Sequence, residues 1–399
     1  GPSFIRNPPS PRNGIIMNIL ITGICGFVGS EVAQVLLSSE PTLNIVGIDN
    51  FSRNGSWLNR DKLVSQGINV VHGDIRNEAD LEAMGPFDWV IDAAANPSVL
   101  AGIDGKSSSR QLVDNNLGGT INLLEACKRW NAGFILLSTS RVYSIPPLAN
   151  LEVEVHDHAY RPIASNQEPR TKNQELIGLS PSGITEQFST APPVSLYGST
   201  KLTSETLALE YGLTFGFPVW INRCGVMAGA RQFGKPDQGI FAFWIHSWRE
   251  GRPLKYIGFD GLGHQVRDCL HPRDLAPLLL KQMAKGSSNN QQPSPNNQEL
   301  RTPRIINLSG GLDSAMSLRQ LSDWCAKRFP DSATIDSLPR SSDDIEGELP
   351  VRPFDLPWVV LDHSIATGTW DWQPQSSVSS ILEEIAAFAE DHPNWISTS

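Results

Sequence analysis

Tyr197 and Lys201 lie four residues apart in the stretch PVSLYGSTKL, which spans residues 193–202. Residues at this spacing lie on the same face of a helix. A free tyrosine has a pKa of about 10, and a nearby ammonium group lowers it because the positive charge stabilises the phenolate. The pair therefore favours a tyrosine that works as a general base near neutral pH, although Y-x-x-x-K alone also describes many ordinary surface helices.

Hydroxyl side chains end the apolar segment FILLSTS at residues 134–140. Thr139 is a candidate to hydrogen-bond a reacting hydroxyl group, and Ser138 and Ser140 are alternatives. Ligands bind at the carboxyl ends of strands in parallel sheets, which is where these residues would lie. Ordinary turn chemistry at the end of a strand remains the structural alternative.

Apolar segments of strand length alternate with segments of helix length along much of the chain. The expected strands are 17–23, 44–50, 68–74, 87–95, 134–140 and 218–226. Helical spacing marks residues 27–39, 57–66, 77–84, 109–131 and 199–216. The alternation predicts an α/β fold with a Rossmann-type doubly wound parallel sheet, because strands this apolar suit burial on both faces.

The strand and helix pattern also divides the chain into regions. Residues 1–16 are interpreted as a tag or disordered leader. A nucleotide-binding domain is expected at 17–222, with an aperiodic insertion at 144–194, and a strand at 304–311 returns to this domain. Residues 223–303 and 312–399 are expected to form a smaller mixed α/β substrate-binding domain. An aperiodic insertion of this length is usually functional or disordered.

Composition excludes several classes of function. A net charge of −10 argues against binding to a nucleic acid polymer. No run of 18 or more apolar residues exists, so no membrane span is expected. Five scattered cysteines without C-x-x-C spacing argue against a disulfide framework or a zinc site, and they fit the cytoplasm. The HDH triplet at 156–158 is interpreted as a solvated loop, and no metal is expected.

The segment TGICGFVGS places Gly23, Gly26 and Gly29 between an expected strand and an expected helix. This context is typical of a dinucleotide-binding turn, in which bare backbone approaches a diphosphate at the start of a helix. Asp49 follows Gly29 by 20 residues, which is the position of a carboxylate that binds the adenosine ribose of NAD. Arg53 is a candidate for the 2′-phosphate of NADP, but Asp49 would repel that phosphate, so NAD is favoured.

The chain resembles the extended short-chain dehydrogenase/reductases, and within them the NAD-dependent epimerase/dehydratase branch. The motifs that carry the resemblance, in order, are the glycine turn, DNFSR, HGDIRN, DAAA, NNLGGTINLLEA, STSRVY, YGSTK and HQVRDCLHPRDL. The segments IDNFSRNG, GITEQFS, NRCGVMAGARQFGKPDQG and GHQVRDCLH are most similar to the 2-epimerases of CDP-linked deoxyhexoses. One departure is Ser144, which stands where the family usually has glycine after VY.

The resemblance implies a set of site residues. Thr139, Tyr197 and Lys201 would be catalytic. The cofactor NAD would contact Gly23, Gly26, Phe27, Val28, Asp49, Asn50, Ser52, Arg53, Asp74, Ile75, Ala93, Ala94, Asn116, Tyr197 and Lys201. The nucleotide-sugar substrate would contact Asn222, Arg231, Gln238, Arg267 and Arg352, with Arg267 on the diphosphate. Salt bridges to Asp268 or Asp355 are the structural alternative for the two arginines Arg267 and Arg352.

The resemblance also implies the reaction and the assembly. The expected activity is inversion of a sugar carbon, C2 first, through a transient keto-sugar with tightly bound NAD, and the chain would form a homodimer or homotetramer. A UDP-sugar 4-epimerase and a 4,6-dehydratase are alternatives, but Ser140 and Arg141 stand where a dehydratase would carry acidic residues. A non-catalytic NAD-binding regulatory protein is an alternative of another class.

Overall fold

The computed structural model describes residues 16–103, 105, 108–163, 176–236, 238–288, 302–345 and 354–398. The expected leader, apart from Ile16, and the expected substrate contact Arg352 lie outside the described residues. In the described part of the chain, no helix combines the length and the apolar character needed to cross a membrane.

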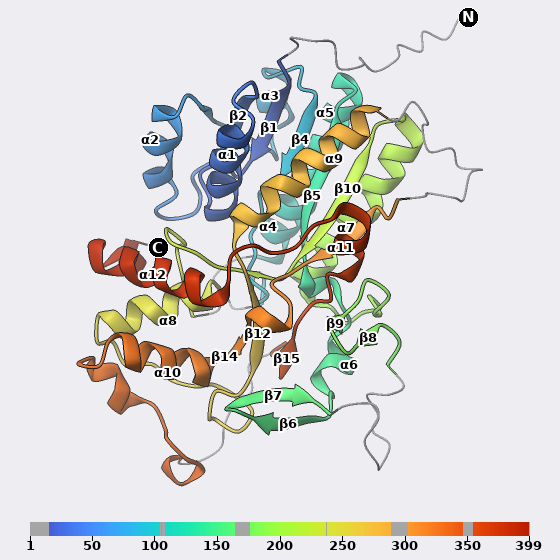
Figure 1. Cartoon of the computed structure of the whole chain (residues 1–399). Coiled ribbons are helices and arrows are strands. Elements are labelled where there is room, and N and C mark those ends of the chain that lie inside the picture. Colours follow the sequence, from blue (N-terminus) through green and yellow to red (C-terminus); the bar gives the residue numbers. More distant parts are fainter. Residues whose placement is uncertain are drawn as a thin grey trace, which may run out of the picture.

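A seven-stranded parallel sheet forms the upper part of the molecule in Figure 1. Its strands are β1 (Asn18–Thr22), β2 (Asn44–Asp49), β3 (Asn69–His72), β4 (Trp89–Asp92), β5 (Gly133–Thr139), β10 (Val219–Cys224) and β13 (Ile305–Leu308). They lie side by side in the order β13-β10-β5-β4-β1-β2-β3. The order reverses between β1 and β4, and ligands of such sheets bind at the carboxyl ends of the strands near this point. The predicted Rossmann-type class is confirmed.

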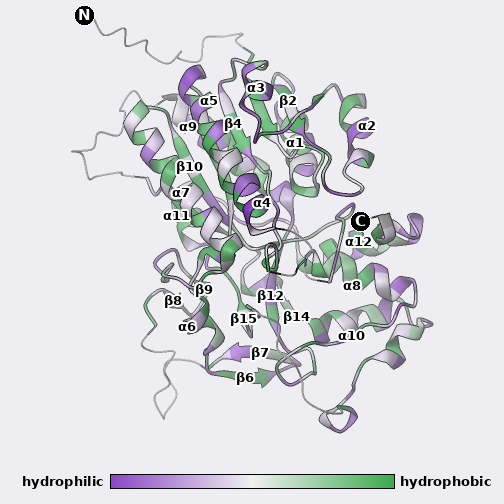
Figure 2. Ribbon diagram, turned by 180° about the vertical axis from the view of Figure 1, so that it is seen from behind, coloured by the Kyte–Doolittle hydropathy of each residue, from purple (hydrophilic) through white to green (hydrophobic). Residues whose placement is uncertain are grey.

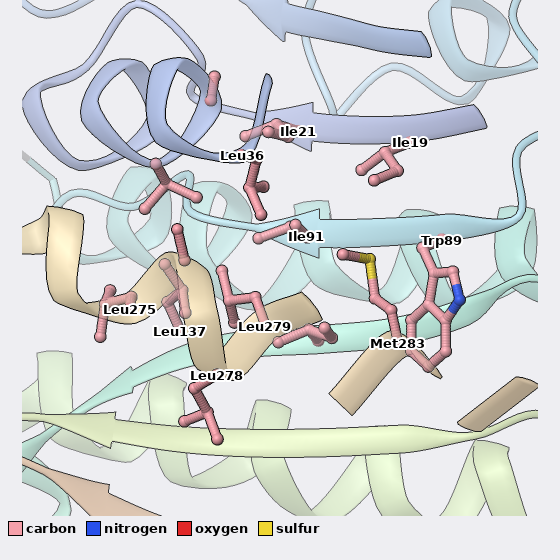
Figure 3. Close-up of a cluster of buried hydrophobic side chains, with 14 of the residues drawn as sticks. Ile19, Ile21, Leu36, Trp89, Ile91, Leu137, Leu275, Leu278, Leu279 and Met283 are labelled. Atoms are coloured by element: carbon pink, nitrogen blue, oxygen red, sulfur yellow. The ribbon is translucent and has the colours of Figure 1, made fainter. Parts of the chain in front are cut away.

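Helices cover both faces of this sheet. They are α1 (Phe27–Ser39), α2 (Trp57–Ser65), α3 (Glu78–Glu82), α5 (Gly119–Trp130), α7 (Ser195–Phe215), α9 (Ala276–Ser288) and α11 (Ser364–Trp370). Successive strand residues point to opposite faces, so Ile19 and Ile21 pack with α1 and α9 while Leu20 packs with α5 and α7. Figure 3 shows the first of these clusters, in which Leu279 and Met283 of α9 lie against the sheet. The sequence division placed α9 with the second domain, but its apolar face is buried on the main sheet.

The helix predicted at 109–131 is divided into three pieces. They are α4 (Ser109–Val113), a π-helical turn η1 (Asp114–Gly118) and α5. Figure 2 shows this side of the molecule, where α4, α5 and α7 lie in front of the sheet. Asn116 in the π turn is buried, and its amide bonds the backbone of Asn96 and the hydroxyl of Thr200. Such turns are frequent at functional sites because they redirect side chains within a helix.

A smaller mixed sheet lies below the main sheet in Figure 1. It consists of β11 (Val226–Met227), β12 (Val266–Leu270), β14 (Ala315–Ser317) and β15 (Trp358–Val359). The helices α8 (Ile240–Arg249), α10 (Leu318–Arg328) and α12 (Val378–Asp391) share an apolar core beside it. Short 3₁₀ turns are η2 (Ser140–Val142), η4 (Pro272–Leu275), η5 (Leu312–Ser314), η6 (Ala333–Ser337), η7 (Ser342–Asp344) and η8 (Trp395–Thr398).

The insertion at 144–194 contains regular structure that its sequence did not reveal. Its elements are α6 (Ile145–Ala149), β6 (Val153–His156), β7 (Ala159–Pro162), β8 (Leu179–Ser180) and β9 (Gly183–Ile184), and residues 164–175 lie outside the described part. The elements are too short to show periodicity, and long-range bonds such as that from the N–H of Ile184 to the carbonyl of Val360 hold them. Ser144 has φ −55°, so this position does not need a glycine. In the HDH triplet, His156 ends β6, and Asp157 and His158, both at positive φ, form the turn that leads into β7.

Candidate active site

A cavity of about 1130 Å³ lies between the carboxyl ends of the main sheet and the second sheet. Its walls include the residues that follow β1, β2, β4, β5 and β10, together with residues of α8 and β12. Typical small-molecule pockets measure roughly 300–1,000 Å³. The cavity is therefore large enough for a cofactor and a second ligand together.

The glycine turn presents bare backbone to this cavity. Gly23 has φ +60°, a conformation that favours glycine. A methyl group at Gly29 would lie 2.3 Å from the carbonyl oxygen of Gly23, so α1 packs against the turn only without a side chain there. Gly26 precedes the first residue of α1, and Phe27 and Val28 line the cavity at the positive end of the helix dipole. This cradle fits the diphosphate of a dinucleotide.

Asp49 lies at the end of β2 on the same wall. Its carboxylate accepts hydrogen bonds from the backbone N–H groups of Cys25 at 2.9 Å and Phe51 at 2.8 Å. Burial raises the pKa of this carboxyl, and the backbone donors oppose the rise. The carboxylate is therefore held in one orientation between the glycine turn and the cavity, which fits a bond to ribose hydroxyls.

Asp74 and Asn50, two further expected cofactor contacts, also line the cavity. The amide of Asn50 donates to the carboxylate of Asp74 at 3.1 Å, and Arg76 forms a salt bridge with the same carboxylate at 2.6 Å. The hydrogen bonds from Arg76 lower the pKa of Asp74 to about 2. Other expected cofactor contacts that line the cavity are Ser52, Arg53, Ile75, Ala93 and Ala94.

Thr139 and Tyr197 come together at the carboxyl end of β5. Thr139 Oγ1 accepts from the backbone N–H of Arg141 at 3.1 Å, which fixes the threonine side chain. Burial raises the pKa of Tyr197 to about 12, while a hydrogen bond with Thr139 and the charge of Arg141 lower it. Gly198 follows the tyrosine, and a methyl group there would lie 2.3 Å from the carbonyl oxygen of Arg141. The glycine of YGSTK thus lets α7 bring Tyr197 close to Thr139.

Lys201 lies behind this wall rather than on it. Lys201 is 2% exposed and is not among the described residues that line the cavity. Burial lowers the pKa of Lys201, and the carboxylates of Asp92 and Glu205 oppose the fall. Glu205 also forms a buried salt bridge with Arg223 at 2.7 Å and accepts from Ser138 at 2.5 Å.

Arg267 in β12 lines the opposite side of the cavity. Its guanidinium pairs with Asp355 at 3.0 Å, and burial lowers its pKa while Asp355 opposes the fall. Gln238 lines the same cavity and accepts a hydrogen bond from Arg53, so an expected substrate contact and an expected cofactor contact are paired in the structure. The buried Nε2 of Gln238 has no hydrogen-bond partner within the described residues.

Two expected substrate contacts lie away from the cavity, which corrects their placement. Asn222 is fully buried, and its amide forms a reciprocal pair of hydrogen bonds with Gln282 of α9 at 2.8 and 3.0 Å. Arg231 bonds Asn59 at 3.0 Å and stacks its guanidinium near the ring of Trp395. Successive residues of a strand point to opposite faces, and the side chain of Asn222 points to the face covered by α9. The loop after β11 directs Arg231 toward the C-terminal segment around Trp395. Asn116, expected near the cofactor, also lies behind the cavity wall.

Gln265 is a site residue that sequence reasoning missed. It lines the cavity and is 7% exposed. Its Nε2 donates to the carbonyl of Ile257 at 3.1 Å, which leaves Oε1 buried without a partner. The motif HQVRD could have indicated this residue. Side chains two residues apart in a strand point to the same face, so Gln265 is expected to face the cavity together with Arg267.

The described residues include no group of three or more His, Cys, Asp or Glu side chains placed to hold a metal ion. All five cysteines are buried free thiols. One cavity thus brings together the glycine turn at the start of α1, the carboxylate of Asp49, the hydroxyl groups of Thr139 and Tyr197, and the guanidinium of Arg267.

The chain matches the NAD dependent epimerase/dehydratase family over residues 19–296. CDP-paratose 2-epimerase of Salmonella typhi is 29% identical over 379 residues, which cover 92% of this chain and 98% of the relative. UDP-glucuronate 4-epimerase of Thermodesulfobacterium geofontis is 24% identical, with 94% of this chain and 96% of the relative covered.

A solved structure agrees with these relatives. The crystal structure of UDP-glucuronic acid 4-epimerase from Bacillus cereus, in complex with UDP-glucuronic acid and NAD, superposes with a TM-score of 0.68 at 26% identity. The superposition covers 94% of this chain and 99% of that chain. The relatives named here share the family and differ in the nucleotide and the ring carbon. This chain belongs to the NAD dependent epimerase/dehydratase family, and its cofactor is NAD.

Proposed function

We propose that this protein is a nucleotide-sugar epimerase that inverts C2 of a CDP-linked deoxyhexose or a closely related nucleoside-diphosphate sugar. The observation that supports an epimerase is the shared cavity, in which Thr139 and Tyr197 lie with the glycine turn and Arg267. The similarity to CDP-paratose 2-epimerase over 92% of the chain supports the choice of C2.

The cofactor side is assigned as follows. The turn at Gly23–Val28 would hold the diphosphate of NAD, and Asp49 would hold its adenosine ribose. The other proposed contacts are Asn50, Ser52, Arg53, Asp74, Ile75, Ala93 and Ala94, all of which line the cavity. When bound, NAD supplies a reversible acceptor for the hydride of a sugar C–H bond.

The chain's own part in the reaction is proton transfer and orientation. Tyr197 takes the proton of the sugar hydroxyl as that carbon becomes a carbonyl, and Thr139 hydrogen-bonds the same oxygen. After the sugar has turned its other face, Tyr197 returns the proton. Lys201 completes the proposed catalytic set from its buried position behind Tyr197 on the same helix.

Arg267 would hold the substrate through its diphosphate, because a guanidinium fork matches phosphate oxygens. Anchoring at the diphosphate suits an epimerase, since the sugar must be free to present both faces. Gln238 and Gln265 add unpartnered amide atoms to the same cavity. We assign both to the nucleotide-sugar.

A UDP-sugar 4-epimerase is the second candidate. The coverage of the UDP-glucuronic acid 4-epimerase structure, 94% of this chain, favours it, and the same residues would serve either carbon. A 4,6-dehydratase is disfavoured because Ser140 and Arg141 replace the acidic pair that would follow Thr139.

Isotope labelling separates these candidates. CDP-, UDP- and GDP-sugars are screened for binding by mass spectrometry, and products are identified by NMR. Each substrate that reacts is then prepared with deuterium at C2 or at C4. We expect a primary isotope effect at C2 with the label retained, and no turnover by Tyr197→Phe although it still binds NAD. An effect at C4 would select the 4-epimerase, and no turnover of any nucleotide-sugar by the NAD-loaded protein would contradict the proposal.

We also propose a homodimer or homotetramer in which the helices at 109–131 and 199–212 pair across a two-fold axis. Exposed apolar side chains on α4 and α7 support the pairing, with Val113 of α4 37% exposed and Leu196 and Phe215 of α7 each 41% exposed. Light scattering coupled to size exclusion would measure the assembly. A monomer at micromolar concentration would contradict it.

A further inference from the structure

The ring of Phe233, in the loop after β11, contacts two parts of the chain that are distant in sequence. A methyl group at Gly55 would lie 2.5 Å from this ring, so the ring lies directly against the bare backbone of the glycine. The ring also stacks on the indole of Trp395 in η8, with centroids 4.9 Å apart and an interplanar angle of 13°. Both aromatic residues are buried. Phe233 therefore joins the loop after β2, which contains Gly55, to the C-terminal segment.

Trp395 contacts three consecutive residues of the loop after β11. The guanidinium of Arg231 lies 5.5 Å from the centroid of the indole, and the indole N–H donates to the carbonyl oxygen of Gln232 at 3.1 Å. The third contact is the stack on Phe233. A cation near an indole ring, a hydrogen bond and a stacked pair are each favourable, and together they hold this part of the loop on the indole.

The indole is itself held by α8 and α12. The ring of Phe388 in α12 lies edge-on to the indole, with centroids 4.9 Å apart. The backbone N–H of Asn394, the residue before Trp395, donates to the carboxylate of Glu250 at the end of α8 at 2.9 Å. Figure 1 shows the C-terminal end of the chain beside α12 and α8. Trp395 thus connects the loop after β11 to these two helices.

The residues that Trp395 holds lie beside a proposed cofactor contact. Gln232 and Phe233 line the cavity, whereas Trp395 is not among the described residues that line it. The carbonyl oxygen of Phe233 accepts a hydrogen bond from Nη2 of Arg53, and Nη1 of the same guanidinium donates to Gln238. Hydrogen bonds require a narrow range of distance and angle, so the place of Phe233 decides the place of the Arg53 guanidinium.

We infer that Trp395 is a positioning residue for the cofactor: it holds Phe233, and through Phe233 it fixes Arg53 at the cavity wall, which slows the release of NAD. The inference rests on the proposed contact between Arg53 and NAD, and not on the proposed substrate. Slow release suits an epimerase, because the hydride that is taken from the sugar must be returned by the same cofactor molecule. Trp395 acts from outside the cavity, and no bond is formed or broken in this role.

The rate at which the loaded protein releases NAD tests this inference. The protein is loaded with isotopically labelled NAD, an excess of unlabelled NAD is added, and the label that stays bound is followed over time by filtration. We expect Trp395→Leu to release NAD at least about tenfold faster, since the stacked pair and the indole hydrogen bond are both lost. Phe233→Leu should do the same, and Trp395→Phe, which can still stack, should lie closer to the wild type.

Trp370→Leu is the matched control. Trp370 is 6% exposed, close to the 7% of Trp395, and it packs edge-on against Trp220 of β10 with centroids 5.0 Å apart. A loss of stability alone would act in both leucine variants, whereas the proposed role belongs to Trp395. Trp370→Leu should therefore release NAD at the wild-type rate, and circular dichroism shows that each variant is folded under the conditions of the assay.

A double-mutant cycle shows whether the effect passes through Arg53. Arg53→Met alone should accelerate release, and Trp395→Leu should then add less than about a further twofold, because residues that act through one contact are not additive.

Four outcomes would each overturn the inference. They are unchanged release in both Trp395→Leu and Phe233→Leu, equally fast release in Trp370→Leu, an undiminished effect of Trp395→Leu in the Arg53→Met background, and unchanged release in Arg53→Met alone. The last would remove Arg53 from the cofactor contacts. The assay contains no nucleotide-sugar, so these outcomes are distinct from a failure of the proposed reaction.

Discussion

Arg223→Met should strongly destabilise the protein, because it leaves the carboxylate of Glu205 buried without its counter-ion. The side chains of Arg223 and Glu205 are 5% and 2% exposed. The guanidinium makes three N–H···O contacts with the carboxylate, at 2.7, 3.1 and 3.2 Å. After the substitution, the hydroxyl of Ser138 at 2.5 Å would be the remaining side-chain donor to Glu205 within the described residues.

The expected magnitude follows from these contacts. Removing one partner of a buried ion pair costs about 3–5 kcal/mol, whereas replacing both partners with apolar groups of similar volume is often nearly neutral. The double variant Arg223→Met/Glu205→Leu should therefore recover most of the lost free energy of unfolding. A deficit of about 1 kcal/mol or more would remain, because Ser138 loses its acceptor and the buried Lys201 loses one of the two carboxylates that favour its charge.

Urea denaturation followed by tryptophan fluorescence measures these free energies. Arg110→Met is the matched control, since Arg110 pairs with Asp114 at 2.7 Å but is 84% exposed. An exposed pair contributes under about 1 kcal/mol, so the control should change little. A loss below about 1 kcal/mol for Arg223→Met, or a double variant no more stable than it, would refute the reasoning.

Three further predictions concern the cofactor, pH and the substrate. Gly29→Ala should abolish NAD binding in equilibrium dialysis, because its methyl group would lie 2.3 Å from the carbonyl oxygen of Gly23. Gly368→Ala is the control and should bind NAD as the wild type does, because a methyl group there has no neighbour within 4 Å. Burial lowers the pKa of His246 from 6.5 to about 4, so the folded state resists protonation and the free energy of unfolding should fall as the pH decreases from 6.5 to 4. In urea titrations at several pH values, His246→Phe should reduce this fall. An unchanged slope of the free energy of unfolding against pH would contradict the prediction. Gln265→Met should weaken nucleotide-sugar binding about tenfold in calorimetry without affecting NAD, because the unpartnered Oε1 is lost, and equal affinity would remove Gln265 from the site.

The amino-acid sequence determined the architecture and the cofactor side of the site. Apolar strands such as 134–140 and the glycine turn at Gly23 are local patterns, and their conformations follow from neighbouring residues alone. The residues that end such strands lie at one edge of a parallel sheet, so the sequence alone places Asp49 and Thr139 at the same edge.

Tertiary structure decided the direction and partners of side chains that depend on distant segments. Asn222 in β10 and Arg231 after β11 are close in sequence to residues that line the cavity. In the structure, however, Asn222 binds Gln282 and Arg231 binds Asn59, and both partners are distant in sequence. The sequence placed Lys201 one helical turn after Tyr197, and only the folded sheet brings the carboxylate of Asp92 close enough to act on the pKa of that lysine. Local periodicity specifies the face of a helix or strand on which a residue lies, whereas packing between elements decides which charged groups lie close to one another.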